Sequence, residues 1–308
     1  ILSGLVGSEM CIRDSIEAST QTPVLLDIWA EWCGPCKQLG PVLEQLETEY
    51  AGRFVLAKLD ADKVPQISQQ LSQMFGVRSI PFCVMFKDGQ PVDGFVGALP
   101  AAQTREFLDK HVPTADETEA VQEELAAHEA LAEGDTPSAL ESLQQAVATD
   151  PANDTARFDY LKLLLQLGRD DDAKVAFAPV LPKVIVDRRF QAIQHWIDAS
   201  DYASNTTGQA LSAEALQARI AANKRDFEAR FALAQTLIAG QQWKAAMDEL
   251  LEILMRDRTW NDEIARKTYV SVLELIEPPP VKVAEGQIPP QDPTVATYRR
   301  RLSSVILS

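Results

Sequence analysis

Cysteine and histidine are both scarce in this chain, which has four cysteines and three histidines among 308 residues. Four cysteines are too few for the dense disulfide framework that holds many small secreted domains together. Two of them, Cys11 and Cys83, stand alone in the sequence, so they supply no second pair for a four-ligand structural zinc site. The composition therefore excludes a disulfide scaffold and disfavours structural zinc.

Long apolar runs and an excess of basic residues are also lacking. Charged residues interrupt every apolar stretch well before the roughly 18 residues that a membrane-spanning helix requires. Lysine and arginine number 29 against 45 aspartates and glutamates, a formal net charge of −16, which argues against nucleic acid and against anionic membrane surfaces. We therefore expect neither a membrane nor a nucleic acid as a partner.

The other two cysteines lie close together in a strand-to-helix setting. They belong to the hexapeptide Trp32-Cys33-Gly34-Pro35-Cys36-Lys37. The run from Val24 to Ala30 has the length and apolar content of a strand, and the stretch from Lys37 to Tyr50 has helical apolar spacing. A cysteine at the start of a helix gains stabilisation of its thiolate from the helix dipole and from free backbone N–H groups. This placement favours a redox dithiol over the alternative, half of a zinc site whose other half is missing.

The region from Thr22 to His111 resembles thioredoxin, through the hexapeptide and several separate matches. Asp27 interrupts the apolar strand, and a carboxylate buried without a partner tends to hold its proton. The resemblance implies that Asp27 accepts the proton of the second cysteine, Cys36, and that Lys58 lies near Asp27. The alternative is that Asp27 reaches solvent at the end of the strand.

The run from Phe82 to Phe86 has the composition of a strand, and it opens after Ile80-Pro81, where a proline is tolerated. The resemblance implies a cis Ile80–Pro81 bond that faces the dithiol, whereas general frequencies favour a trans bond. Residues 87–90 predict a hairpin turn, followed by an edge strand over 92–96 and a helix over 99–111. For residues 16–112 we therefore expect an α/β thioredoxin fold, a mixed sheet flanked by helices.

The resemblance implies a mechanism of thiol–disulfide exchange. Cys33 attacks a substrate disulfide as a thiolate, and Cys36 then attacks Cys33 and releases reduced substrate. The Cys33–Cys36 disulfide is the redox group, with no other cofactor and no metal expected. Cys83, within a predicted buried strand, is expected to be a small core hydrophobe rather than a redox residue. The surface that receives the substrate chain is expected to comprise Trp32, Gly34, Pro35, Ile80, Pro81, Gly97 and Ala98.

Residues 1–15 resemble translated sequencing-adapter sequence and lack the basic stretch of a signal peptide. We therefore leave them out of the predicted fold and expect Cys11 to have no role. On this interpretation, part of the first strand and helix of the thioredoxin fold is missing or altered.

From about Asp116 the composition shifts to alanine, leucine, glutamine and glutamate. A glycine is followed five residues later by an alanine in three places, and the glycines lie 34 and 72 residues apart. The pairs are Gly134 and Ala139, Gly168 and Ala173, and Gly240 and Ala245. This pattern resembles tetratricopeptide repeats, in which the glycine ends a helix in the left-handed conformation and the alanine permits close helix packing. The alternative is an irregular bundle whose internal similarity is coincidental.

The repeat pattern sets the expected boundaries of the second half. We predict a linker over 113–118 and an all-α tetratricopeptide-like helical repeat domain over 119–277. The segment 181–223 is expected to hold a degenerate unit with a loop near 200–208. Residues 278–308 predict a proline-rich connector and a helix over 297–307, which either caps the repeats or docks a partner.

A thioredoxin domain followed by tetratricopeptide repeats resembles the bacterial chaperedoxins, which are cytoplasmic holdases that bind unfolding proteins and guard their cysteines. The resemblance covers Thr22 to Leu307. It implies unfolded or oxidised clients, a chaperonin or other refolding chaperone, and thioredoxin reductase as partners. The chain keeps both Cys33 and Cys36, whereas some members have lost the first cysteine of the pair, and it has Ala61 where some carry a client-trapping cysteine. The alternative is a protein disulfide reductase whose repeats dock one specific partner.

Overall fold

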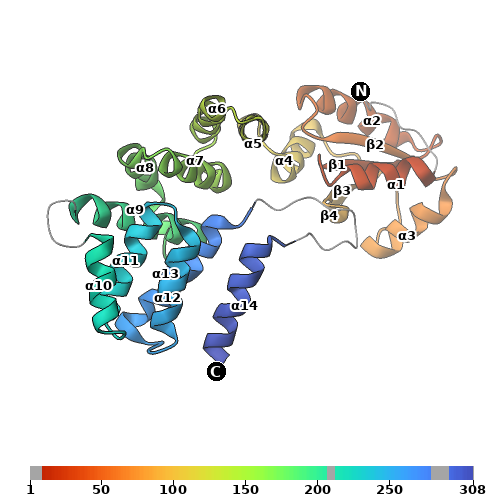
Figure 1. Cartoon of the computed structure of the whole chain (residues 1–308). Coiled ribbons are helices and arrows are strands. Elements are labelled where there is room, and N and C mark those ends of the chain that lie inside the picture. The colour runs from red at the N-terminus through yellow and green to blue at the C-terminus, as the bar shows by residue number, and fades with distance from the viewer. Residues whose placement is uncertain (1–8, 207–211, 279–290, 308) are drawn as a thin grey trace. The chain divides into compact units, whose positions relative to one another are not determined.

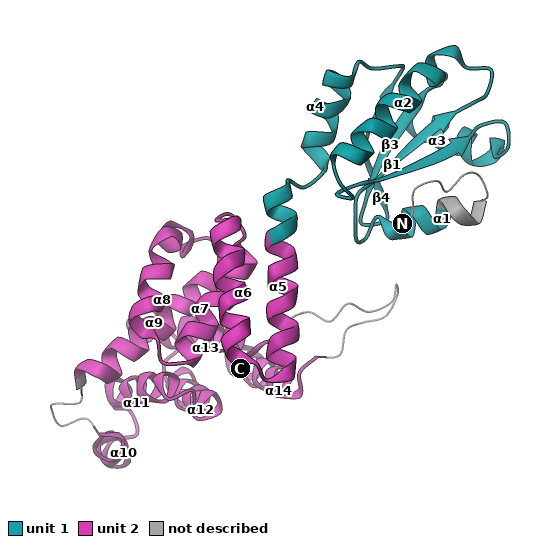
Figure 2. Ribbon diagram, turned by 90° about the horizontal axis from the view of Figure 1, so that it is seen from above, with its two compact units in different colours: residues 1–119 teal, residues 120–308 magenta. Residues whose placement is uncertain are grey.

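The computed structural model describes residues 9–206, 212–278 and 291–307. The chain divides into two compact units, residues 1–119 and 120–308 (Figure 2), and each is described by itself. Figure 1 gives the order of the helices and strands along the chain. None of the described helices combines the length and the apolar content that crossing a membrane requires.

The first unit is built on a mixed sheet whose described strands run in the order β2-β1-β3-β4. Strand β1 pairs with β2 in parallel and with β3 in antiparallel, and β3 pairs with β4 in antiparallel. The predicted thioredoxin fold is confirmed, with β4 as the expected edge strand. The elements are α1 (Glu9–Ala18), β1 (Val24–Trp29), α2 (Gly34–Glu49), β2 (Val55–Asp60), α3 (Pro65–Phe75), β3 (Phe82–Lys87), β4 (Gln90–Val96) and α4 (Ala101–His111).

Alternation along β1 sends successive side chains into two different apolar layers. Val24 and Ile28 pack in the layer that includes Leu71 of α3. Leu25 packs in the opposite layer, with Leu43 of α2. The side chain of residue 27 therefore points to the face that α2 covers.

Helix α1 includes residues 9–15, which were predicted to lie outside the fold. The helix begins at Glu9, and Ser15 is buried. Just beyond its end, Ser19 fixes the β3–β4 turn, because its carbonyl accepts from the N–H of Asp88 and its Oγ accepts from the N–H of Gly89, both at 2.9 Å. The boundary predicted after residue 15 is therefore too late, while residues 1–8 lie outside the described residues.

The second unit is helical throughout its described part, and the predicted fold class is confirmed. The described elements of this unit are all helices, so its core is formed by helix packing. The elements are α5 (Ala115–Glu133), α6 (Thr136–Thr149), α7 (Asp154–Gln166), α8 (Asp170–Phe177), the 3₁₀ helix η1 (Ala178–Lys183), α9 (Arg188–Thr206), α10 (Ala213–Ala222), α11 (Phe227–Ala239), α12 (Trp243–Leu254), α13 (Trp260–Ile276) and α14 (Pro293–Leu307).

The linker predicted over 113–118 is mostly helix, because α5 begins at Ala115. The cause is a capping box. Thr114 Oγ1 accepts from the N–H of Glu117 at 3.1 Å, and Glu117 Oε2 accepts from the N–H of Thr114 at 2.6 Å. This reciprocal pair satisfies backbone donors that would otherwise lack partners at the helix start. Only Val112 to Thr114 separate α4 from α5.

Two of the three glycine–alanine pairs behave as the repeat pattern predicts. Gly134 and Gly168 have φ angles of +83° and +68°, in the left-handed region. Ala139 and Ala173, five residues further on, are fully buried against the neighbouring helices.

The third pair is shifted by one residue, so its prediction is wrong in detail. Gly240 has φ −83°, and the left-handed position is taken by Gln241 at φ +55°. The buried alanine is Ala246, whereas Ala245 is exposed. The spacing of five between the left-handed residue and the buried alanine is kept, which shows that backbone geometry sets the repeat and glycine is dispensable there.

The loop predicted near 200–208 is also displaced. Helix α9 continues to Thr206, and Ser200 is buried within it. Trp196 of the same helix is buried and makes an edge-to-face contact with Trp243 at 4.8 Å between ring centroids. Aromatic packing of this kind favours continued helix over an early loop. The remainder of the predicted loop, like the proline-rich connector over 279–290, lies outside the described residues.

Helix α14 packs on the repeat unit, which favours the capping role over the docking role. Val295 and Tyr298 are buried in the main core of this unit. The backbone carbonyl of Tyr298 accepts from Tyr269 Oη at 2.8 Å, and Arg301 forms an ion pair with Asp248 of α12. The helix starts at Pro293, earlier than predicted, because Asp292 Oδ1 accepts from the N–H groups of the first turn.

The shift in the third repeat predicts opposite effects for two matched substitutions. Gly168→Ala should destabilise the chain by about 1–2 kcal/mol, because an L-residue is strained in the left-handed region. Gly240→Ala should be neutral or stabilising by up to about 1 kcal/mol, because its φ is ordinary. Urea unfolding of both variants measures the difference. Equal destabilisation would contradict the shifted register.

Candidate active site

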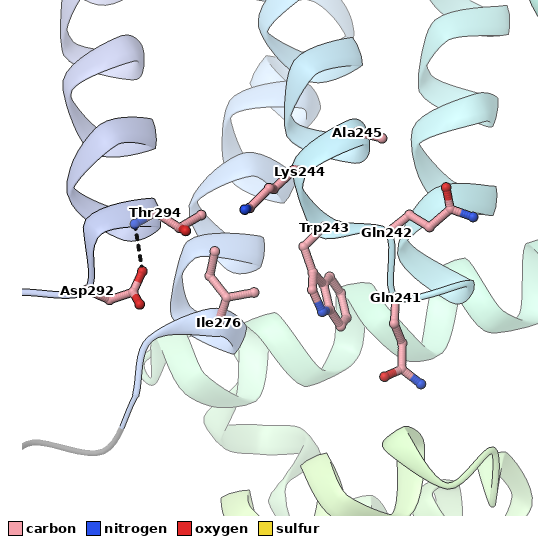
Figure 3. Close-up of a pocket in the computed structure, with 8 residues that line it drawn as sticks. All are labelled: Gln241, Gln242, Trp243, Lys244, Ala245, Ile276, Asp292 and Thr294. Carbon is pink, nitrogen blue, oxygen red and sulfur yellow. Dashed lines mark hydrogen bonds between the residues drawn. The ribbon is translucent and has the colours of Figure 1, made fainter.

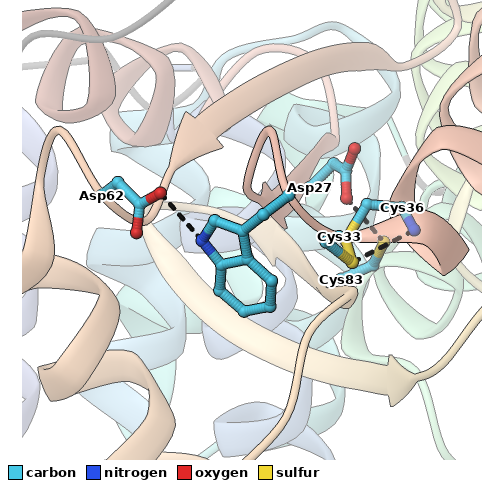
Figure 4. Close-up of a disulfide and its surroundings, with 6 residues drawn as sticks. Asp27, Cys33, Cys36, Asp62 and Cys83 are labelled. Carbon is cyan, nitrogen blue, oxygen red and sulfur yellow. Dashed lines mark hydrogen bonds between the residues drawn. A yellow bond between two sulfur atoms is a disulfide. The ribbon is translucent and has the colours of Figure 1, made fainter.

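The two cysteines of the hexapeptide lie at the beginning of α2 and form a disulfide (Figure 4). Cys33 is the N-cap residue of α2, in extended conformation, and its Sγ accepts from the N–H of Cys36 at 3.2 Å. Pro35 lies in the first helical turn, where its missing N–H costs nothing. The predicted strand-to-helix placement of the dithiol is therefore confirmed.

From this position we expect Cys33 to be the better nucleophile of the pair. When the disulfide is reduced, a thiolate on Cys33 faces the backbone N–H groups and the positive end of the α2 dipole, which stabilise it. Both cysteines are almost fully buried. The neighbouring Trp32 is 72% exposed, and its Nε1 donates to Asp62 Oδ2 at 2.9 Å (Figure 4). The bond to Asp62 orients an apolar surface beside the dithiol.

Asp27 is buried, so the alternative that it reaches solvent is wrong. Only 2% of its surface is exposed. Burial raises the pKa of Asp27 to about 6, although Lys58 and a hydrogen bond from Cys83 act in the opposite direction. A carboxyl with a pKa in this range can accept and release a proton near neutral pH.

Lys58 is the direct register partner of Asp27 on β2, as the resemblance implied. Side chains of paired residues on adjacent strands point to the same face. The ammonium group of Lys58 forms an ion pair with Glu44 of α2. Lys58 therefore favours the charged form of Asp27 through space while its own hydrogen bond goes to Glu44.

Several of the predicted substrate-binding residues are brought next to the disulfide. Ile80 packs against the cluster that contains Cys33 and Cys36, and the Ile80–Pro81 bond is cis. The N–H of Gly97 donates to the carbonyl of Pro81 at 2.8 Å, and its φ of +91° suits glycine. The exposed members of the set are Trp32, Gly34, Pro35 and Ala98.

Two contacts of the site were not anticipated from the sequence. Cys83, expected only to fill the core, is fully buried as predicted but also donates a hydrogen bond from Sγ to Asp27 Oδ1, at 3.7 Å (Figure 4). Asp62 holds the indole of Trp32. Both contacts cross between strands or loops, and local sequence patterns do not report such pairs.

Among the described side chains, metal-ligating groups converge at one place, in the second unit. Glu124 and His128 of α5 meet Asp159 of α7, with ligand atoms within 4.8 Å of one another. His128 Nε2 is paired with Asp159 Oδ2 at 2.9 Å, and Glu124 Oε2 accepts from Asn153 Nδ2 at 3.1 Å. These existing partners account for the cluster, so we assign no metal to it.

A mixed sheet with a Cys-x-x-Cys pair at the start of a helix, above a buried carboxyl, defines a thiol–disulfide oxidoreductase domain, here joined to a helical repeat domain. The family model described as Thioredoxin matches residues 12–110, beginning within the first fifteen residues. Two models described as Tetratricopeptide repeat match residues 130–197 and 206–306.

Thioredoxins of known sequence are similar to the first unit. Thioredoxin of Haemophilus influenzae is 42% identical over 99 residues, which is 32% of this chain and 89% of the relative. Thioredoxin of Chlorobaculum thiosulfatiphilum is 47% identical over 89 residues, 29% of this chain and 79% of the relative. A solved mutant thioredoxin from Halobacterium salinarum is 30% identical, with a TM-score of 0.30, and the match covers 36% of this chain and 90% of that one. The chain belongs to the thioredoxin family.

The roles of the two cysteines predict different failures. Cys33→Ser should abolish reduction of insulin disulfides, because the attacking thiolate is removed. Cys36→Ser should accumulate a mixed disulfide with substrate, because the resolving thiol is removed. Turbidity of insulin and mass spectrometry of the trapped adduct measure the two outcomes. Normal turnover by either variant would contradict the mechanism.

Burial of Asp27 predicts a pH-dependent gain in stability for Asp27→Asn. Because the folded-state pKa is raised to about 6, the stabilising contribution of the protonated carboxyl is full below about pH 4 and is lost as the pH rises through 6. Asparagine stays neutral, so the variant should be more stable than wild type by roughly 2–3 kcal/mol at pH 8 and similar to it near pH 4. Urea unfolding of the oxidised protein at both pH values measures this, and equal stability at pH 8 would refute it.

The same substitution should also affect catalysis at one step. Asp27→Asn should slow release of reduced substrate by Cys36 more than the first attack by Cys33, because only the release step uses the carboxylate as a proton acceptor. Rapid-mixing kinetics with a disulfide peptide separate the two steps. Equal slowing of both would argue against the proton-acceptor role.

Proposed function

We propose that this protein is a redox-active holdase of the bacterial cytoplasm. Its repeat unit binds unfolding proteins, and its Cys33/Cys36 dithiol exchanges or protects their thiols with no cofactor besides that disulfide. Bound clients then pass to a chaperonin or another refolding chaperone, and thioredoxin reductase restores the dithiol. The observation that carries the holding activity is a set of exposed aliphatic side chains on the repeat unit.

Three of these side chains lie within one short stretch. Leu181 of η1 is 50% exposed, and Ile185 and Val186, which follow it, are 92% and 83% exposed. We call these three residues the aliphatic turn. Large apolar side chains gathered on a surface favour association with other apolar surface, and an unfolding protein exposes such surface without a defined shape. The aliphatic turn therefore supports binding of many different clients.

Further exposed aliphatic residues lie on α5. Val121 and Leu125 are 50% and 57% exposed, and their spacing of four places them on one face of the helix. Binding elements separated along a repeat unit favour contact with an extended client at several points.

A second candidate function is a disulfide reductase whose repeats dock one specific partner. A pocket of about 510 Å³ favours it, because its lining combines apolar and polar groups (Figure 3). Trp243 and Ile276 supply the apolar wall, while Gln241, Lys244 and Asp292 supply polar groups at its edge. Such mixed lining suits recognition of a defined side chain.

Suppression of aggregation by a cysteine-free variant tests the holdase. The protein carrying both Cys33→Ser and Cys36→Ser should still reduce light scattering by a heat-aggregating client, because holding through apolar contacts needs no thiol. Absence of suppression in both this variant and the wild type would favour the docking reductase, and loss in the variant alone would contradict holding without thiols.

The aliphatic turn has its own matched test. Ile185→Ser with Val186→Ser should weaken suppression several-fold, while insulin reduction is unchanged. The control is Met74→Ser, which removes an exposed apolar side chain (66%) from the first unit. Equal loss of suppression in the control, or none in the double variant, would show that the aliphatic turn does not bind clients.

A further inference from the structure

We propose that Cys83 is a positioning residue for the exchange reaction: its thiol donates a hydrogen bond that holds the Asp27 carboxylate ionised and oriented to accept the proton of Cys36. The proposal rests on the dithiol chemistry described above and deepens it. It concerns the Asp27–Cys83 pair, which the thioredoxin resemblance does not assign.

Strand pairing places the two side chains together. Asp27 of β1 and Cys83 of β3 are direct partners in the antiparallel register, so both point to the face that α2 covers. The Sγ–Oδ1 distance of 3.7 Å is a hydrogen bond to sulfur. Both residues are buried, at 2% and 0% exposed, so water does not compete strongly for the carboxylate.

The direction of this hydrogen bond is fixed by chemistry. An ionised carboxylate only accepts, and a neutral thiol is a weak donor. Burial raises the pKa of the Cys83 thiol well above its usual range, and the charge of Asp27 raises it further. Cys83 therefore keeps its proton throughout and acts as donor.

The other charged and titratable groups that face Asp27 come from β2 and α2. Lys58 of β2 favours the ionised carboxyl and Glu44 of α2 disfavours it, but these two groups are paired with each other. The Cys33–Cys36 disulfide begins α2. Within the described residues, the hydrogen bond that the Asp27 side chain receives comes from Cys83 alone.

The step that this contact supports balances without any further reagent. Cys36 gives its proton to Asp27 and attacks Cys33 Sγ in the mixed disulfide. The Cys33–Cys36 bond forms and the bond from Cys33 to substrate sulfur breaks. The dithiol loses two electrons and the substrate disulfide gains them; the substrate leaves as a thiolate and takes up a proton. Cys83 neither gains nor loses a proton, so it is not a catalytic residue.

A thiol suits this role because its hydrogen bond is weak. Hydrogen bonding to the charged form of a carboxyl lowers its pKa, and several strong donors can lower it below 2. One weak donor within an apolar layer lowers the pKa of Asp27 only modestly. The carboxyl can therefore be ionised, as a base must be, and still be basic enough to accept a proton.

The test is the pH dependence of the release step in three variants, measured by rapid mixing of reduced full-length protein with a disulfide peptide from pH 5 to 9. In Cys83→Val the carboxylate loses its donor. The acid limb of the profile, where the release rate decreases as the pH falls, should therefore move to higher pH. The release rate at pH 6 should fall roughly three- to tenfold while the rate at pH 8.5 stays within about twofold of wild type. Cys83→Ser, which keeps a donor, should restore the wild-type limb or move it to lower pH. Cys83→Ala should shift the limb as valine does.

A role for Cys83 in packing alone would give a different result. An unshifted acid limb in both Cys83→Val and Cys83→Ala, or uniform slowing at every pH, would overturn the proposal. Asp27→Asn separates this failure from failure of the base role. If Asp27→Asn abolishes the acid limb while the Cys83 variants leave it in place, the base role stands and the positioning role falls. If Asp27→Asn itself leaves the limb in place, both fall.

Discussion

The burial of one carboxyl group, that of Asp27, is the constraint around which the redox site is arranged. An acid in an apolar layer opposes folding when it is ionised. Two neighbouring strands and one helix contribute to its surroundings: Lys58 from β2, Cys83 from β3 and Glu44 from α2. The site therefore keeps an unfavourable group in place, as active sites often do, and the rest of the sheet supplies the stability that makes this possible.

The second unit depends on a different constraint, the close packing of helix pairs. A residue in the left-handed conformation turns the chain, and an alanine five residues later is buried at the crossing. Gln241 and Ala246 keep this geometry, although the glycine and alanine of the sequence pattern, Gly240 and Ala245, lie one position earlier. Strain at one non-glycine residue is acceptable because Trp243, two residues further on, packs against the buried Trp196 and fixes the backbone there.

Much of the site could be predicted because its signals are local. The Cys33–Cys36 pair, the acid inside an apolar strand and the Ile80–Pro81 bond each lie within a few residues of a recognisable pattern. The hydrogen bond from Cys83 to Asp27 could not be predicted in this way, because it depends on the register between strands 56 residues apart. The capping box of Thr114 and Glu117 was readable as a Thr-x-x-Glu pattern, and the linker prediction overlooked it. Chaperone activity, clients and compartment concern other molecules and stay proposals.

The capping box has a consequence for how this chain can be divided. The boundary between the two units falls between residues 119 and 120, inside α5, which runs without interruption from Ala115 to Glu133. Ala120 and Ala127 of that helix are buried. A truncation designed at the boundary would therefore cut a helix in two and deprive the repeat domain of its first turn. Pro113 and Thr114 are the place where an expression clone, a protease or a gene fusion could separate the two modules and leave each with whole secondary structure.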